Sequence, residues 1–116
     1  MPKEVATADQ PALSPSGTYT LQVVVHANAA GGDTQSFQIL DSAQAVVFAA
    51  AEEFSLRDTT YFLWDAADRV WVYSGDVGTF FWERGADGAW NKSVYATSSV
   101  PAPQFLKDTR PKYHPR

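Results

Sequence analysis

A chain of 116 residues is long enough for one domain with a single hydrophobic core and too short for two. Hydrophobic residues make up 45 % of it and charged residues 19 %, a composition typical of globular proteins that excludes an intrinsically disordered chain. Cysteine is absent, which excludes disulfides and thiolate metal sites, and no apolar run approaches the roughly 20 residues of a membrane-spanning helix. We therefore expect no membrane partner.

The charge is distributed unevenly along the chain. Residues 1–100 carry a net charge of −7 and residues 101–116 a net charge of +3, which together give −4. An acidic body argues against a nucleic-acid partner, because contacts with the phosphate backbone rely on clustered lysine and arginine. The basic tail could contact an anionic partner, but a frayed terminus or a strap lying on the acidic body is the simpler interpretation.

The first 16 residues contain Pro2, Pro11 and Pro15 and no periodic apolar pattern, which indicates a flexible lead-in. They also lack the apolar core of a secretory signal, so we expect a cytoplasmic protein. Tails rich in proline, alanine and serine also follow cleaved signals, which leaves a periplasmic or secreted location as the alternative.

Three strands are predicted in the first half of the β domain, residues 17–100. Residues 18–26 alternate between apolar and polar side chains, the pattern of a half-buried strand, and a turn rich in glycine and asparagine follows. Residues 34–40 form the second strand. Residues 45–51 could also form a helix, since alanine and glutamate favour one, but the short Val-Val-Phe run favours a third strand.

A meander of four further strands is predicted at residues 60–65, 69–74, 79–84 and 89–95. The connections DAAD, GDVG and GADG are short and carry the aspartate or glycine that tight turns require, so neighbouring strands should pair antiparallel. In the Pro-rich tail, residues 104–108 should form a single helical turn, because Pro111 and Pro115 prevent a longer helix.

These elements predict a single all-β domain of six or seven mostly antiparallel strands, forming a sandwich or a partly closed barrel, with a short C-terminal helical turn. Its core is expected to contain nine residues: Tyr19, Leu21, Val23, Val25, Phe37, Ile39, Phe48, Val70 and Val72.

All four tryptophans lie between residues 59 and 90, where three successive strands place large apolar side chains on both faces. In one interpretation, the termini and loops cover the second face and complete a sandwich. In the other, part of that face is an exposed aromatic platform, because large exposed apolar patches usually mark binding sites. On the platform hypothesis, at least one tryptophan should be substantially exposed beside acidic turn residues. The candidate binding residues are Trp64, Trp71, Tyr73, Trp82, Trp90, Asp65, Asp68, Asp76 and Asp87.

No catalytic or metal-binding residue is predicted. His26 and His114 are the only histidines, lack the HxH or HExxH spacing of metal ligands, and are interpreted as surface residues. The adjacent carboxylates Glu52 and Glu53 would point apart in an extended loop, and the GDVG turn lacks the lysine and helix of a phosphate-binding loop. We expect no cofactor and no metal.

Three functions are compatible with this pattern. The first is a small acidic protein-binding module, an inhibitor, adaptor or immunity-type partner, whose charge favours a basic protein. The second is a carbohydrate-binding module that stacks sugar rings on exposed tryptophan and tyrosine. The third is a small enzyme or a ligand-carrying barrel.

Overall fold

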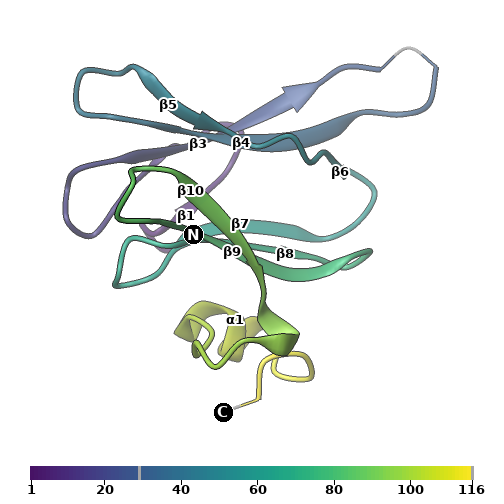
Figure 1. Ribbon diagram of the computed structural model, residues 1–116. Helices are drawn as coiled ribbons and strands as arrows, with labels where there is room; N and C mark the ends of the chain where they lie inside the picture. Colours follow the sequence, from purple (N-terminus) through teal and green to yellow (C-terminus); the bar gives the residue numbers. More distant parts are fainter. Residues whose placement is uncertain (29, 116) are drawn as a thin grey trace.

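The computed structural model describes residues 1–28 and 30–115, and they form three layers (Figure 1). Two antiparallel β-sheets face each other, and the C-terminal segment lies beneath the lower sheet. The prediction of an all-β domain with a short helical turn is therefore confirmed. Within the described part of the chain, no helix is long and apolar enough to cross a membrane.

The lower sheet, which we call the meander sheet, contains five strands of the described residues. Their spatial order is β1 (Val5–Ala6), β7 (Thr60–Trp64), β8 (Val70–Ser74), β9 (Gly78–Arg84) and β10 (Trp90–Val94). The second sheet has the order β2 (Ala12–Leu13), β3 (Thr20–His26), β4 (Thr34–Leu40) and β5 (Val46–Ala49), and β6 (Phe54–Ser55) also pairs with β4. A 3₁₀ turn, η1 (Tyr95–Thr97), and a helix, α1 (Gln104–Thr109), follow β10.

The predicted strands at residues 18–26, 34–40, 45–51 and throughout the meander are confirmed, with ends that differ by at most two residues. Three of the hairpins share one turn geometry, in which the fourth residue adopts a left-handed backbone: Gln44 (φ 65°), Asp68 (φ 58°) and Gly88 (φ 85°). Each turn is closed by a backbone hydrogen bond from its first residue to the residue after the left-handed one, with lengths of 2.7–3.0 Å. Asparagine, aspartate and glycine tolerate this conformation, which explains the Asp and Gly signals in the sequence.

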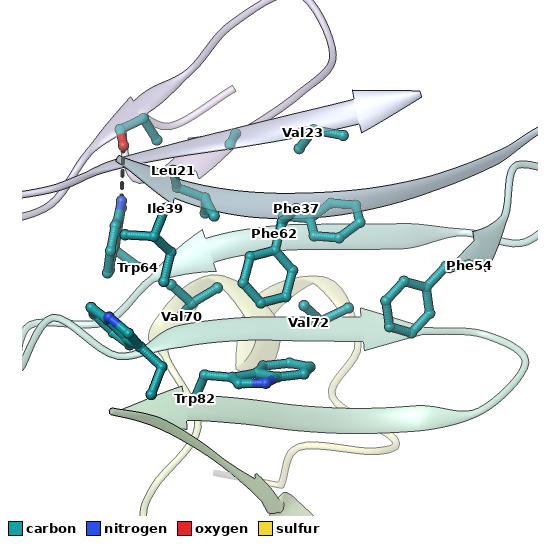
Figure 2. Packing of buried hydrophobic residues seen from close by; sticks show 13 residues of the cluster. Leu21, Val23, Phe37, Ile39, Phe54, Phe62, Trp64, Val70, Val72 and Trp82 are labelled. Carbon is teal, nitrogen blue, oxygen red and sulfur yellow. Dashed lines mark hydrogen bonds between the residues drawn. The ribbon is translucent and has the colours of Figure 1, made fainter. Parts of the chain in front are cut away.

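The main core lies between the two sheets (Figure 2). Six of the nine predicted core residues are buried there: Leu21, Val23, Phe37, Ile39, Val70 and Val72. Tyr19 and Phe48 are partly buried against the same cluster. The prediction for Val25 is wrong, since its side chain is 45 % exposed. Val25 lies near the end of β3, where the β3–β4 hairpin diverges from the meander sheet towards its loop (Figure 1).

The lead-in predicted for residues 1–16 is an integral part of the sandwich. Strand β1 pairs with β7, placing Val5 opposite Leu63, and β2 pairs with β3, placing Ala12 opposite Leu21. Val5 and Ala12 are both buried, so the expectation of a flexible segment is wrong. The segment crosses from one sheet to the other and closes one side of the core.

The basic tail is a strap rather than a frayed end as far as residue 115. Residues 95–114 cover the outer face of the meander sheet, where Ala102 and Leu106 are buried. Beneath them lies a second apolar cluster of the sheet: Val5, Leu63, Trp71, Tyr73 and Phe81. Helix α1 extends the predicted helical turn by one residue.

Candidate functional site

The four tryptophans are buried, so the predicted exposed platform is wrong. The exposed fraction is 1 % for Trp64, 0 % for Trp71, 2 % for Trp82 and 9 % for Trp90. Trp64, Trp82 and Trp90 belong to the core between the sheets, whereas Trp71 belongs to the cluster on the outer face of the meander sheet. Both faces of this sheet are covered, one by the second sheet and the other by residues 95–114. The sandwich interpretation of the aromatic stretch therefore holds.

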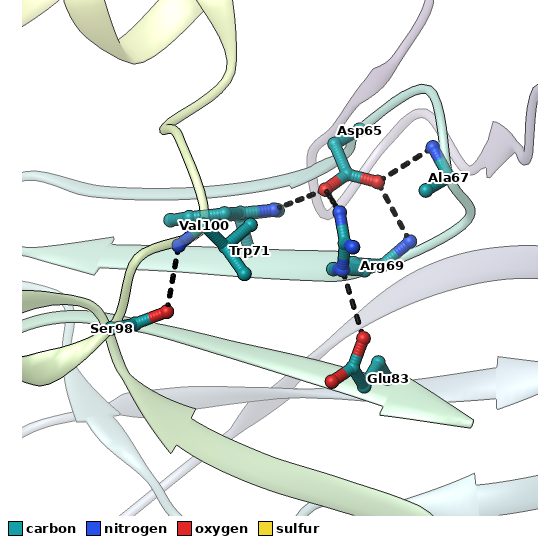
Figure 3. Close-up of polar contacts among 7 residues, drawn as sticks. All are labelled: Asp65, Ala67, Arg69, Trp71, Glu83, Ser98 and Val100. Atoms are coloured by element: carbon teal, nitrogen blue, oxygen red, sulfur yellow. Dashed lines mark hydrogen bonds and ion pairs between the residues drawn. The ribbon is translucent and has the colours of Figure 1, made fainter. Parts of the chain in front are cut away.

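Two of the indole N–H groups, those of Trp64 and Trp71, have polar partners, as buried tryptophans usually do. The indole N–H of Trp64 donates to the backbone carbonyl of Ala12 at 2.8 Å, which fixes the crossing lead-in against the core (Figure 2). The indole N–H of Trp71 donates to the carboxylate of Asp65, also at 2.8 Å (Figure 3). These bonds assign both tryptophans to the interior of the fold.

Asp65 organises the β7–β8 turn instead of facing a ligand (Figure 3). Its carboxylate accepts the backbone N–H groups of Ala67 at 2.9 Å and Arg69 at 3.0 Å, and it forms an ion pair with the Arg69 guanidinium at 3.0 Å. Arg69 also pairs with Glu83 on β9 at 2.9 Å. This hydrogen bond to Glu83, opposed by burial, and the bonds to Asp65 raise the pKa of Arg69.

The other predicted aspartates do not gather at one site. Asp68 accepts the backbone N–H of Ser16 at 3.2 Å and a hydrogen bond from the Ser16 hydroxyl, which ties the β7–β8 turn to the segment before β3. Asp87 accepts the backbone N–H of Ala89 within its own turn at 3.0 Å. Because the meander is antiparallel, these turns lie at one end of the sheet and Asp76, in the β8–β9 turn, lies at the other.

Two of the predicted residues, Tyr73 and Asp76, line a cavity of about 420 Å³ at this opposite end. We call it the tyrosine cleft, and it is formed by Tyr73, Val77, Thr79, Phe80, Val94, Tyr95 and Tyr113, with Asp76 beside them. Strands β8, β9 and β10 contribute one wall, and the C-terminal segment contributes Tyr113. The carboxylate of Asp76 forms no ion pair or hydrogen bond with the residues that the structure describes.

Three apolar side chains around the tyrosine cleft are markedly exposed. The exposed fraction is 53 % for Val77, 44 % for Val94 and 53 % for Tyr113. Their positions in the chain lie far apart, in a hairpin turn, at the end of a strand and in the tail. The sequence offered no signal for this convergence, because it depends on the C-terminal segment folding back beneath the meander sheet.

His114 lies beside the cleft and is completely buried, so its interpretation as a surface residue is wrong. Its Nδ1 atom is 2.9 Å from the Arg110 carbonyl, which can only accept, so Nδ1 carries the proton. The Nε2 atom therefore accepts a hydrogen bond from the Thr79 hydroxyl at 2.8 Å. Burial, opposed by hydrogen bonds from the imidazole to backbone carbonyls, lowers the pKa of His114 and favours the neutral ring.

A hydroxyl and an imidazole at this spacing also match a nucleophile and its base. The His114 imidazole, however, is enclosed by the rings of Tyr73 and Tyr95, whose centroids lie 5.6 and 5.4 Å away. We therefore assign the Thr79–His114 pair to holding the tail against the sheet. In the described part of the chain, no group of three or more His, Asp or Glu side chains is arranged to hold a metal ion.

By contrast, His26 is exposed as predicted, and its Nε2 atom lies 2.9 Å from the Ser36 hydroxyl on β4. Comparison with protein-family models, with curated proteins and with solved structures found no match to this chain.

Proposed function

We propose that the protein is a non-catalytic module that binds a basic protein partner through the tyrosine cleft. The observation that carries this proposal is the convergence of three exposed apolar side chains, Val77, Val94 and Tyr113, around a cavity of about 420 Å³. Clustered apolar surface of this kind marks interaction sites on monomers. A cavity ringed by apolar contacts suits an anchor side chain of a partner, since such anchors dominate binding energies.

The expected partner is basic because the β domain that forms most of the cleft is acidic, and the partner must also accommodate the Lys112 ammonium, which lies 5.7 Å from the centre of the Tyr113 ring. Asp76 presents an unpaired carboxylate among the residues that the structure describes, and residues 1–100 carry a net charge of −7. Complementary charge accelerates encounter and selects the partner more than it adds affinity. An inhibitor, an adaptor or an immunity-type protein would use this arrangement. The carbohydrate alternative is less well supported, since the four tryptophans are buried and Tyr113 is the exposed ring of the cleft on which a sugar could stack.

Selection from a library of random peptides tests the proposal without knowledge of the natural partner. We expect enrichment of peptides that combine one aromatic or large aliphatic residue with flanking lysine or arginine. Amide chemical shifts should change at Tyr73, Val77 and Tyr113 when such a peptide binds. Binding should weaken as the salt concentration rises, because screening reduces the charge attraction.

Val77→Lys should abolish binding of the selected peptides, because it places a cation in the apolar part of the cleft. Its effect on stability should stay within about 0.5 kcal/mol, as for other exposed positions. Val46→Lys is the matched control, since Val46 is equally exposed, at 52 %, but lies on the second sheet. Equal peptide affinity in wild type and Val77→Lys, or an enriched pool without basic residues, would refute the proposal.

A further inference from the structure

The strands of the second sheet contain no Asp, Glu, Lys or Arg in any position from β2 to β6. Charged residues make up 19 % of the chain, so their absence from a whole sheet is a local property. Antiparallel sheets commonly turn one face to water, and such faces usually carry polar and charged side chains. The uncharged composition of this sheet therefore needs a physical reason.

The outer face of the second sheet is not covered by another layer (Figure 1). Alternation places Leu21 and Phe37 in the core, so their neighbours in sequence point outward. The outward pairs include Thr20 with Leu40, Gln22 with Gln38, and Val24 with Ser36, and within these pairs Leu40 and Ser36 are themselves buried. Leu13 and Val46 lie at the two edges of the same face and are 62 % and 52 % exposed.

The polar groups on this face can both donate and accept hydrogen bonds. Gln38 already donates to Gln22 across the β3–β4 pair, and Ser36 bonds to His26. Amides and hydroxyls have both functions in one side chain, so a face built from them can pair with an identical face. In a two-fold symmetric dimer, the same patch meets itself and requires this self-complementarity. A shallow hollow of about 170 Å³ runs beside Val24, Ser36 and Gln38.

We propose that the outer face of the second sheet binds a second copy of this chain. Each copy has a net charge of −4, so two copies repel, and this repulsion is weakest when the face through which they meet carries no charge of its own. This face meets that condition, with acidic residues only at its perimeter: Asp33, Asp41 and Glu53. A foreign partner recruited by charge would instead be drawn to the carboxylates elsewhere on the molecule.

The size of the face predicts a weak dimer. The seven residues of β3 and of β4 span about 24 Å each, and four strands spaced about 5 Å apart are about 15–20 Å wide. The footprint is therefore roughly 400 Å² per copy, or about 800 Å² for both. Stable interfaces bury about 1,200–2,000 Å² in total, so the dimer should form at high protein concentration and dissociate on dilution.

Sedimentation equilibrium of the purified chain tests this inference. The weight-average mass of the wild type should rise from 12.7 kDa towards twice that value between about 10 µM and 1 mM, the weak-binding range. Gln38→Lys should remain at the monomer mass, because it brings two like charges together at the contact. Val24→Lys repeats the test at a neighbouring outward position, and circular dichroism confirms that each variant is folded.

Val77→Lys, at the tyrosine cleft, is the matched control and should associate as the wild type does. The dependence on salt distinguishes the two proposed binding surfaces. Screening of the acidic perimeter should strengthen the dimer, whereas it should weaken binding of a basic peptide in the cleft. A wild type that stays monomeric up to 1 mM, or a folded Gln38→Lys that associates like the wild type, would overturn the inference. Peptide binding by Gln38→Lys would remain intact in either case, so the two proposals fail separately.

Discussion

The two sheets pack on the same core but present opposite outer faces. The meander sheet places Leu63, Trp71 and Phe81 outward, and the strap of residues 95–114 buries them. The second sheet places Gln22 and Gln38 outward, and no layer lies over them (Figure 1). Both sheets are antiparallel and of similar width, so strand order does not account for the difference. The size and polarity of the outward side chains decide whether a face needs a cover.

The free energy gained by covering the outer face therefore differs between the two sheets. A buried tryptophan removes about 150–250 Å² from water, which at about 25 cal/mol per Å² corresponds to roughly 4–6 kcal/mol as an upper estimate. The burial of Trp71 alone therefore strongly favours folding of the strap onto the meander sheet. Gln22 and Gln38 form hydrogen bonds in place and gain little from a cover within the same chain. The basic tail is consequently part of the fold.

The largest effect that follows from this comparison is the loss of Trp71. Trp71→Ala should lower the free energy of unfolding by about 3–5 kcal/mol, as for other buried aromatic residues. Val46→Ala on the bare face should change it by less than about 0.5 kcal/mol. Urea unfolding followed by circular dichroism measures both values. Similar losses for the two variants would mean that the two outer faces contribute equally to stability.

A smaller loss of stability is expected when Asp65 is removed, because it links Trp71 on the outer face of the meander sheet to the β7–β8 turn. Asp65→Ala removes the acceptor of the buried Trp71 indole N–H and of two backbone N–H groups in the turn. It should lower the free energy of unfolding by about 1–3 kcal/mol. Asp87→Ala removes a single exposed turn contact and should cost about 0.5–1 kcal/mol. Thermal unfolding of both variants gives the comparison. A loss for Asp87→Ala that equals that of Asp65→Ala would argue against a special structural role for Asp65.

Much of the fold could be predicted because local signals and tertiary structure agree in it. The meander turns carry aspartate or glycine where the backbone is left-handed, as at Asp68 and Gly88, and β3 alternates cleanly over Leu21 and Val23. Residues 45–51 were ambiguous between helix and strand, and the β-branched and aromatic side chains of Val46–Ala49 decide for strand.

The rest of the fold depends on contacts that no local pattern encodes. Strands β1 and β2 have two residues each, too few to show a period, and they form because Val5 and Ala12 meet sheets far away in sequence. The candidate site could be predicted only in part. Tyr73 and Asp76 line the cleft, but the second sheet and the strap together bury the predicted platform, and the strap supplies Tyr113, which no sequence signal placed there.

The smallest predicted effect concerns the Thr79–His114 hydrogen bond, a latch that holds the end of the strap against the meander sheet. Burial holds the pKa of His114 below its usual value of 6.5, and the ring is surrounded by Tyr73, Tyr95 and Thr79, with the Arg110 guanidinium over the Tyr73 ring. In the unfolded chain the imidazole takes up a proton near pH 6.5, whereas in the folded chain it does so only at lower pH. The unfolded state therefore binds more protons in this window, and stability falls as the pH drops.

The melting temperature should accordingly be highest above about pH 7 and should decline between about pH 6.5 and the lowered pKa of His114. His114→Gln keeps a donor for the Arg110 carbonyl and an acceptor for the Thr79 hydroxyl but cannot be protonated, so it should remove most of this decline. His26→Gln should preserve the decline, because His26 is exposed on the second sheet. If the pH profile of His114→Gln matched that of the wild type, burial of the imidazole would not be what couples the strap to pH. The meander sheet would then keep its cover through apolar contacts alone, without a titrating latch.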